Sequence, residues 1–343
     1  MSDRRALVGG WSSVVHGEAT AGDVLSMRAV EAALLAAGVD VDLAWSPVMA
    51  TAPGAGGVEL SRADPDAYTD LVWACGPLHG RPVAEVAARF SRLRRTAVGV
   101  SVVDDDDEGL RAWHLVLARD APGIAAVRDL AAGPAAVLAR DLLGDTARPP
   151  SSLSSTSMLP PSSSVPAGSG VVGVYLAPGQ AEYGVRRRHD AVTEALGHWL
   201  GSLSRRGVAR LALDTRLDPR GWRDPATAAE VLAIIRRCDA VVTMRLHGLV
   251  LALAAGVPAV AVDPVAGGGK VSAQARAWGW PAVISAEQLL GAAPAGERLL
   301  GEQLAWAMGE RGRAAAQRAA VEAPDAGREQ LEALVSAVLA PRS

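Results

Sequence analysis

A strand end, an arginine and a histidine coincide in one stretch of the chain, DAVVTMRLHGLVLALAAG over residues 239–256. The pattern predicts a buried strand over 239–244 and a helix over 246–255, so Arg245 and His247 fall where open α/β sheets bind ligands. Free N–H groups and the helix dipole favour an anion there, and a guanidinium fits phosphate or carboxylate. A histidine can donate to that anion or transfer a proton near neutral pH. The alternative is a surface arginine with a histidine that caps the helix.

Lys270 is the only lysine of the chain, among 34 basic residues. It follows three glycines, just after an apolar strand expected over 257–263. A lysine carries a compact charge on a slim stem, which can enter a loop where the arginine fork does not fit. The alternative is that one lysine survived by chance.

Polar residues also follow two strand ends of the first half. His16, Glu18 and Asp23 lie in or after the loop that follows a strand over 6–9, and His79 follows a strand over 70–74. We expect these side chains to face a cleft between two domains, where Glu18 or His79 could take a proton from a substrate hydroxyl. The alternative for each is a local cap or turn hydrogen bond, and Asp23 also suits the N-cap of a helix over 24–37.

Composition limits the classes of partner. The 343 residues carry a net charge of -3, which gives no basic surface for nucleic acid or for acidic lipid. The five acids from Asp104 to Glu108 are typical of a solvated turn, and we expect no metal. The two cysteines, Cys75 and Cys238, cannot form a disulfide framework, and we expect buried thiols in a reducing compartment. Polar residues and glycines interrupt every apolar stretch, so the sequence predicts a cytoplasmic protein without a targeting or membrane segment.

These residues need parallel strands whose carboxyl ends share one edge. Apolar strands are expected over 6–9, 39–45, 70–74, 96–103, 171–176, 208–213, 239–244 and 257–263, alternating with helices over 24–37, 190–205, 225–237 and 246–255. Short crossings between such strands predict parallel sheets covered on both faces. The fold class is therefore α/β, with two Rossmann-like doubly wound domains that face a cleft.

Residues 147–170 are almost wholly Pro, Ser and Gly, which predicts a flexible linker. We therefore expect an N-terminal domain over 1–146 and a C-terminal domain over 171–343, which ends in a helix. An ordered irregular loop is the alternative for the linker.

The stretch MRLHGLVLALAAGVPAVAV with a following lysine resembles the polysaccharide pyruvyl transferase family. Weaker similarity extends to DPATAAEVLAIIRRCDAVVT and GVVGVYLAP in the second half, and to HGEATAGD, DLVWACGPLHG and RRTAVGVSV in the first. The resemblance implies a glycosyltransferase-B-like fold and transfer of a pyruvyl group from phosphoenolpyruvate, as co-substrate, to a saccharide. The product would be a pyruvate ketal in cell-surface polysaccharide synthesis, and no other cofactor is implied.

The resemblance also assigns roles to residues. Arg245, Leu246, His247 and Lys270 fall on the donor-binding positions of the family. His247 would be the general acid, the donor would lie on the C-terminal domain and the acceptor contacts on the N-terminal one. The loop positions described above, rather than the resemblance, add Glu18 as a second catalytic candidate and His16, Asp23 and His79 as acceptor contacts. The saccharide could be lipid-linked, and the oligomeric state stays open.

One position departs from the family. An arginine often follows the first strand of the second domain, whereas this chain has Ala177. Arg186, in the nearby RRRH segment, could take its place as a donor contact, or that segment could be a solvated helix start. Two alternatives to pyruvyl transfer therefore stay open, which are a glycosyltransferase that uses a nucleotide sugar and a non-catalytic saccharide-binding relative.

Overall fold

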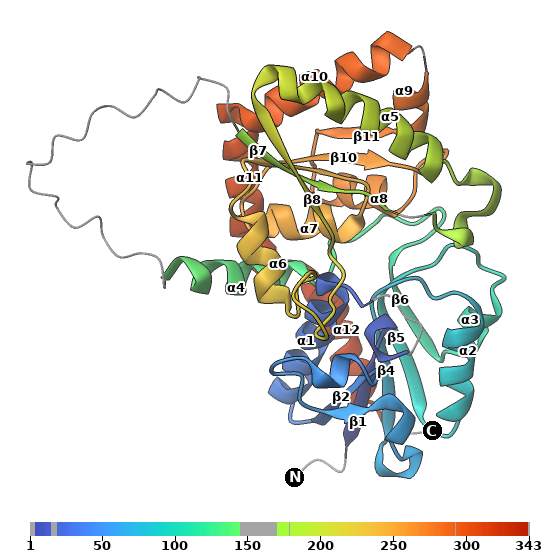
Figure 1. Ribbon diagram of the computed structural model, residues 1–343. Helices are drawn as coiled ribbons and strands as arrows, with labels where there is room; N and C mark the ends of the chain where they lie inside the picture. Colours follow the sequence, from blue (N-terminus) through green and yellow to red (C-terminus); the bar gives the residue numbers. More distant parts are fainter. Residues whose placement is uncertain (1–3, 15–18, 145–169, 178, 292, 342–343) are drawn as a thin grey trace, which may run out of the picture.

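The computed structural model describes residues 4–14, 19–144, 170–177, 179–291 and 293–341. Two parallel sheets face each other with helices packed around them, which confirms the predicted α/β class of two Rossmann-like units (Figure 1). The linker expected over 147–170 lies outside the described residues except for Gly170, so that expectation stays a prediction.

The first sheet has the strand order β3-β2-β1-β4-β5-β6, with every pair parallel. Its centre is fully buried, because β4 reads as a continuous apolar run after its first residue. The strands are β1 (Arg5–Gly9), β2 (Asp40–Trp45), β3 (Val58–Glu59), β4 (Asp70–Ala74), β5 (Arg94–Ser101) and β6 (Leu115–Asp120).

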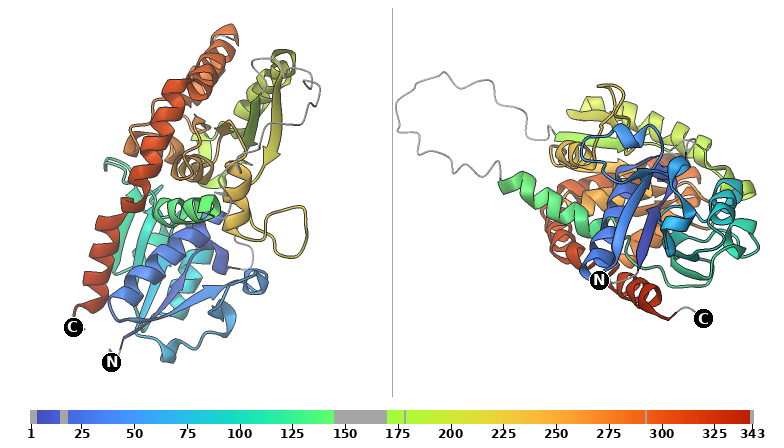
Figure 2. Two further views of the ribbon diagram at one scale, coloured as in Figure 1. Left: turned by 90° about the vertical axis from the view of Figure 1, so that its left-hand side faces the viewer. Right: turned by 90° about the horizontal axis from the view of Figure 1, so that it is seen from below.

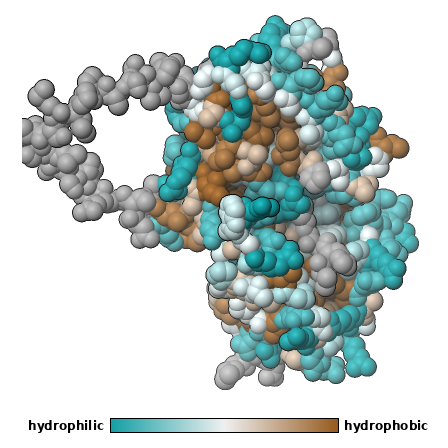
Figure 3. Space-filling model, viewed as in Figure 1, coloured by the Kyte–Doolittle hydropathy of each residue, from teal (hydrophilic) through white to brown (hydrophobic). Residues whose placement is uncertain are grey.

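The second sheet has the order β11-β10-β9-β7-β8 and is also parallel throughout. Its strands are β7 (Gly170–Tyr175), β8 (Val208–Leu213), β9 (Ala240–Thr243), β10 (Ala259–Asp263) and β11 (Val283–Ser285). The edge strand β8 leaves Leu211 44% exposed, and Figure 3 shows apolar residues gathered on the surface where β7 and β8 lie.

Helices cover both sheets and connect their strands. In the first half they are α1 (Ala21–Ala36), α2 (Gly80–Arg89), α3 (Glu108–Arg111) and α4 (Ala132–Gly144). In the second they are α5 (His189–Ser202), α6 (Ala228–Ile235), α7 (Leu246–Ala254), α8 (Lys270–Ala277), α9 (Ala286–Leu290), α10 (Ala293–Met308), α11 (Glu310–Glu322) and α12 (Arg328–Leu339). None of the helices in the described part is long and apolar enough to cross a membrane.

Two helix starts differ from the prediction because a threonine caps each helix. Thr20, rather than Asp23, is the N-cap of α1, and Asp23 completes a capping box with it. The helix predicted from Pro225 begins only at Ala228, because the Thr227 side chain accepts a hydrogen bond from the Glu230 N–H. The other predicted strands and helices are present with small shifts of their ends.

The chain passes between the two sheets twice. After β6, residues 121–131 lead to α4, which packs against α6 and α7 as well as α1. After α11, residues 323–327 lead to α12, which returns to the first sheet and packs against β5 and α1 (Figure 2). The predicted boundaries of 1–146 and 171–343 stay a prediction, but α12, which they assign to the second domain, lies on the first.

Candidate functional site

A pocket of about 360 Å³ lies between the carboxyl ends of the two sheets. Both sheets contribute, because each lining segment follows or ends a strand. The lining residues are Trp11, Thr20, Asp23, Gly76, Pro77, His79, Arg119, Ala177, Gly179, Gln180, Ala181, Glu182, Thr215, Met244, Arg245, Leu246, His247 and Lys270. We call this the site pocket.

The start of α7 faces the site pocket. The Thr243 hydroxyl accepts from the Arg245 N–H and donates to the Arg245 carbonyl, at 2.9 Å each, and so fixes the turn into the helix. Gly248 permits this turn, because a Cβ there would lie 2.2 Å from the Thr243 Oγ1. No side chain caps α7, so its first N–H groups stay available to a ligand.

Arg245 is buried beside this helix start and reaches across to the ends of β7 and β8. Its Nε donates to the Leu176 carbonyl at 3.1 Å, and a terminal nitrogen lies 3.5 Å from the Asp214 carboxylate. These contacts hold the guanidinium against the pocket wall. Arg245 can therefore bind an anion at the α7 start as a preorganised charge.

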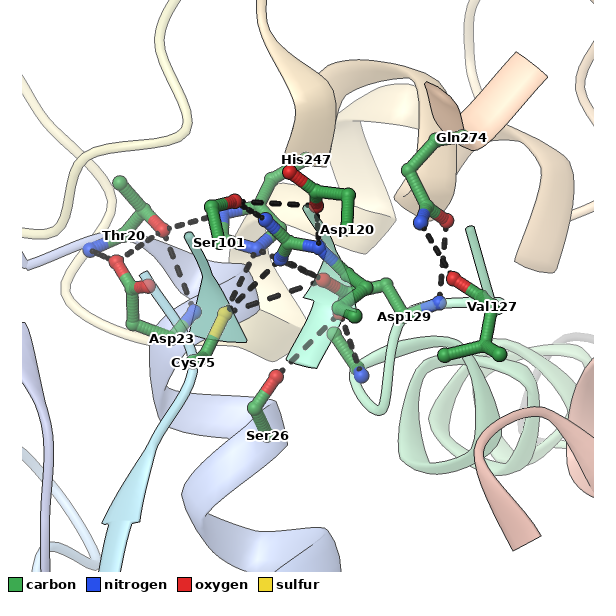
Figure 4. Close-up of polar contacts among 12 residues, drawn as sticks. Thr20, Asp23, Ser26, Cys75, Ser101, Asp120, Val127, Asp129, His247 and Gln274 are labelled. Carbon is green, nitrogen blue, oxygen red and sulfur yellow. Dashed lines mark hydrogen bonds and ion pairs between the residues drawn. The ribbon is translucent and has the colours of Figure 1, made fainter. Parts of the chain in front are cut away.

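His247 joins the second sheet to the first. Its Nδ1 lies 2.8 Å from the Thr20 Oγ1, and the Thr20 hydroxyl donates to the Asp23 carboxylate at 2.6 Å (Figure 4). Both partners come from the start of α1. The His247 ring is therefore hydrogen-bonded to a threonine–aspartate pair from the first half of the chain.

The other ring nitrogen of His247 faces a buried polar cluster. The Cys75 Sγ lies 3.5 Å from the His247 Nε2, and the Asp129 Oδ2 lies 3.8 Å from it. Arg119 is 2% exposed and contacts Cys75, Asp129 and the Asp120 carboxylate, the last at 2.7 Å. In Figure 4, dashed lines join the Cys75 and Asp129 side chains to the His247 ring.

This cluster keeps His247 charged. Burial opposes the imidazolium, but contacts with Cys75 and with the Asp129 and Asp23 carboxylates raise the pKa of His247 to about 10. Burial also opposes ionisation of Asp129, but the Arg119 guanidinium and His247 hold its pKa well below its usual range. Burial and Asp129 raise the pKa of the Cys75 thiol, while His247 lowers it. At neutral pH the His247 Nδ1–H therefore donates to Thr20.

Lys270 begins α8, which follows β10, the strand next to β9, and it lines the site pocket. Its Nζ lies 6.0 Å from the centroid of the Tyr183 ring, within the range of a cation–π contact. Burial lowers the pKa of Lys270, and Arg119 acts in the same direction while Glu182 opposes it. The sequence-predicted residues Arg245, Leu246, His247 and Lys270 thus line one pocket.

The remaining predicted residues are distributed differently. Asp23 and His79 also line the site pocket, and the His79 Nδ1 lies 2.5 Å from the Asp107 carboxylate, within the acidic run. Asp107 itself caps α3. His16 and Glu18 lie outside the described residues. Arg186 lines a neighbouring cavity rather than the site pocket, where sequence reasoning expected it.

Four residues around His247 were not predicted as functional, namely Thr20, Cys75, Arg119 and Asp129. Only Thr20 carried a sequence signal, because threonine three positions before an acid is a capping-box pattern. Cys75 was correctly expected to be buried, but its contact with His247 was not foreseen.

Asp23, Cys75 and His247 also place potential metal-ligand atoms within 4.8 Å of one another. Arg119 lies 3.5 Å from the Cys75 sulfur, and its charge disfavours a cation there. Asp23 already accepts from Thr20. The arrangement suits proton transfer better than metal binding, and the sequence expectation of no metal stays a prediction.

The two facing sheets and their interdomain pocket define a glycosyltransferase-B-like α/β fold. A Methanocaldococcus jannaschii UDP-GlcNAc 2-epimerase in complex with UDP-GlcNAc and UDP is 8% identical, with a TM-score of 0.52 over 93% of this chain and 99% of that one. The Neisseria meningitidis UDP-GlcNAc 2-epimerase bound to UDP-GlcNAc is 9% identical, with a TM-score of 0.52 over 98% and 99%. A spinosyn rhamnosyltransferase complexed with thymidine diphosphate is 14% identical, with a TM-score of 0.50 over 97% and 99%. At these identities the likeness shows the fold alone.

Within this fold, residues 209–264 match the family model described as polysaccharide pyruvyl transferase. The match confirms the resemblance over that stretch, which contains Arg245, Leu246 and His247, while Lys270 lies just beyond it. A comparison with curated proteins found no match. The family match over this stretch supports a transferase.

Proposed function

We propose that this protein transfers a pyruvyl group from phosphoenolpyruvate to a saccharide and forms a cyclic ketal. One observation carries the proposal, which is that Arg245, His247 and Lys270 line one pocket at the uncapped start of α7. Two of the three lie inside the stretch that matches the pyruvyl transferase model.

The donor explains why cations gather in a protein whose net charge is -3. Phosphoenolpyruvate carries a phosphate and a carboxylate. In the proposal, Arg245 and the first N–H groups of α7 bind one of these anions, and Lys270 at the start of α8 binds the other. No further cofactor takes part.

The chemistry needs a proton on the enol methylene, because protonation makes C2 electrophilic toward the saccharide hydroxyls. Two hydroxyl oxygens then bond to C2, each hydroxyl loses its proton, and the C2–O bond to phosphate breaks, so that inorganic phosphate leaves. His247 suits this role because its raised pKa keeps it protonated at neutral pH. Thr20 lines the site pocket, and its hydroxyl oxygen accepts the hydrogen bond from the His247 Nδ1–H. A donor that displaces the Thr20 hydroxyl would therefore meet that proton directly.

The saccharide would enter from the first sheet, whose strand ends carry Trp11, Pro77 and His79 along the same pocket. His79 is 42% exposed and held by Asp107, so it is accessible to an acceptor hydroxyl. Glu18 lies outside the described residues, and we propose it as the base that deprotonates the acceptor hydroxyl. The two buried free thiols, Cys75 and Cys238, suit the reducing cytoplasm, where we propose that the reaction occurs.

Calorimetry can separate this proposal from its two rivals. We expect the protein to bind phosphoenolpyruvate and to bind neither UDP nor a UDP-sugar. Binding of the nucleotide alone would indicate a glycosyltransferase, and binding of neither would indicate a non-catalytic relative. Either result would refute pyruvyl transfer.

The role of His247 is tested with His247→Asn, which keeps a hydrogen-bonding group but cannot deliver a proton. We expect turnover to fall roughly 10²–10⁴-fold, while the Kd for phosphoenolpyruvate changes little. Near-normal turnover would assign the proton to another group. Arg245→Gln is the contrasting variant, because it should weaken donor binding first.

A further inference from the structure

A second cavity of about 260 Å³ lies next to the site pocket. Lys270 lines both, so the two spaces share one wall. The second cavity lies among loops from both sheets. Its lining residues are Val102, Val103, Asp120, Ala121, Pro122, Gly123, Ile124, Tyr183, Arg186, Gly268, Gly269, Lys270, Ala273 and Arg276. We call it the side cavity.

Three cations line the side cavity, and no described carboxylate lies within ion-pair distance of any of them. They are Arg186, Lys270 and Arg276. Two nearby arginines do form ion pairs. Arg187 pairs with Asp190, and Arg119 pairs with two aspartates. Unpaired like charges around one concavity repel each other, so the cavity attracts an anion.

The aromatic ring of Tyr183 supports two of these cations. The Arg186 guanidinium lies 5.9 Å from its centroid and the Lys270 ammonium 6.0 Å. Such contacts hold a cation without neutralising it. Asp120 is the one acid in the lining, and its carboxylate already accepts from the Arg119 Nε at 2.7 Å and from the Ser101 hydroxyl at 3.1 Å.

We propose that the side cavity binds a phosphoryl group of the acceptor, so that the enzyme acts on a phosphorylated saccharide. This inference rests on the proposed function. The donor anions already have Arg245, the α7 start and Lys270 in the site pocket, and the side cavity adds Arg186 and Arg276, which the donor does not need. The shared wall at Lys270 places an acceptor phosphate next to the donor.

The arrangement of the cations favours a phosphoryl group over a carboxylate. Arg186 comes from the segment before α5, Lys270 from the first residue of α8 and Arg276 from its last turn. A tetrahedral anion offers oxygens in several directions and a charge near -2, which three separated cations match. A planar carboxylate is already satisfied by one arginine fork.

The test is calorimetry with inorganic pyrophosphate and with a hexose 1-phosphate, each on the 343-residue protein. Arg245→Gln serves as the background, because pyrophosphate could also enter the site pocket. In that background we expect Arg276→Gln and Arg186→Gln each to raise the Kd roughly 10-fold, and the double variant roughly 100-fold. The control is Arg318→Gln, an exposed arginine on α11, which should leave the Kd unchanged.

Three results would overturn the proposal. In the first, the hexose or a hexuronate binds as tightly as the hexose 1-phosphate. In the second, the Arg276→Gln and Arg186→Gln variants bind pyrophosphate with the same Kd as the Arg245→Gln background. In the third, Arg276→Gln weakens phosphoenolpyruvate binding in the otherwise wild-type protein. The last result would place the donor in the side cavity. Failure of pyruvyl transfer itself is distinguishable, because phosphoenolpyruvate would then not bind, while the arginine dependence of pyrophosphate binding would persist.

Discussion

Gly22 of α1 lies against the ring of His247 across the boundary between the two sheets. A Cβ at Gly22 would lie 2.1 Å from the His247 Cδ2 and 2.5 Å from its Nε2. Real Cβ contacts are never this short, and His247 is held on both sides, by Thr20 and by Cys75. Only glycine at this position lets α1 approach the ring.

Gly22→Ala should therefore displace His247, lower turnover by at least roughly 100-fold and lower the melting temperature. Gly197→Ala is the matched control, because Gly197 lies in α5 with nothing within 4 Å of a Cβ. It should stabilise the protein by about 0.5–1 kcal/mol through helix propensity alone. Thermal unfolding and kinetics of both variants check the expectation, which fails if the two behave alike.

Asp129→Asn should lower the pKa of His247, because it removes one of the groups that favour the imidazolium. The raised pKa implies that charged His247 stabilises the fold fully below about 6.5, its unfolded value, and that this contribution is lost as pH rises through about 10. NMR titration of the His247 ring measures the shift directly.

Asp129 is buried and paired with Arg119, so Asp129→Asn could also unfold the chain. Asp23→Asn is the milder second variant, because Asp23 favours the imidazolium through a different contact. An unchanged His247 pKa in both variants would contradict the assigned cause. In the proposed mechanism, each variant should also move the alkaline limb of the pH–rate profile to lower pH.

Cys75 is the one non-glycine residue with a positive φ in the described part of the chain, at 64°. Left-handed backbone costs about 1–2 kcal/mol for a residue with a side chain, and glycine avoids this cost. Cys75→Gly should therefore be more stable than Cys75→Ala by about 1 kcal/mol in urea unfolding, although both lose the thiol. Equal stabilities would show that the backbone at this position is not strained.

Lys270→Arg should weaken donor binding or turnover several-fold, although the charge is kept. The Lys270 ammonium lies beside the Tyr183 ring, and Lys270 lines both the site pocket and the side cavity. An arginine there would need more room and a planar set of hydrogen-bond partners. Arg318→Lys, an exchange on the exposed face of α11, is the control for the exchange itself. Wild-type kinetics in Lys270→Arg would show that the lone lysine is incidental.

The sequence predicted those site residues that lie close together along the chain. Arg245 and His247 follow one buried strand, so strand periodicity and the rule that ligands bind at strand ends were enough to place them. Thr20, Cys75 and Asp129 come from separate segments and meet at His247 only through tertiary packing. No spacing rule connects such residues.

Arg186 shows how nearness in sequence can mislead. It lies nine residues after Ala177, which lines the site pocket, and a substitute for the missing arginine was expected there. Gly184 has a φ of 48° and a non-helical ψ of -124°, and the backbone bends at this residue. Arg186 follows that bend and lines the side cavity instead.

The two chain passages between the sheets touch each other. A Cβ at Gly327, in the second passage, would lie 2.3 Å from the Leu130 Cδ2 in the first, and a Cβ at Gly133 would lie 3.5 Å from the Pro324 carbonyl oxygen. In the described part of the chain the two passages are therefore side by side, and we infer that they form a single pivot. The halves can change their mutual angle by rotation at this pivot without stretching either passage. Hydrogen bonds also join the halves away from the pivot, between residues 19–21 and 215–217 and between Thr20 and His247. Any rotation that opens the site pocket has to break them.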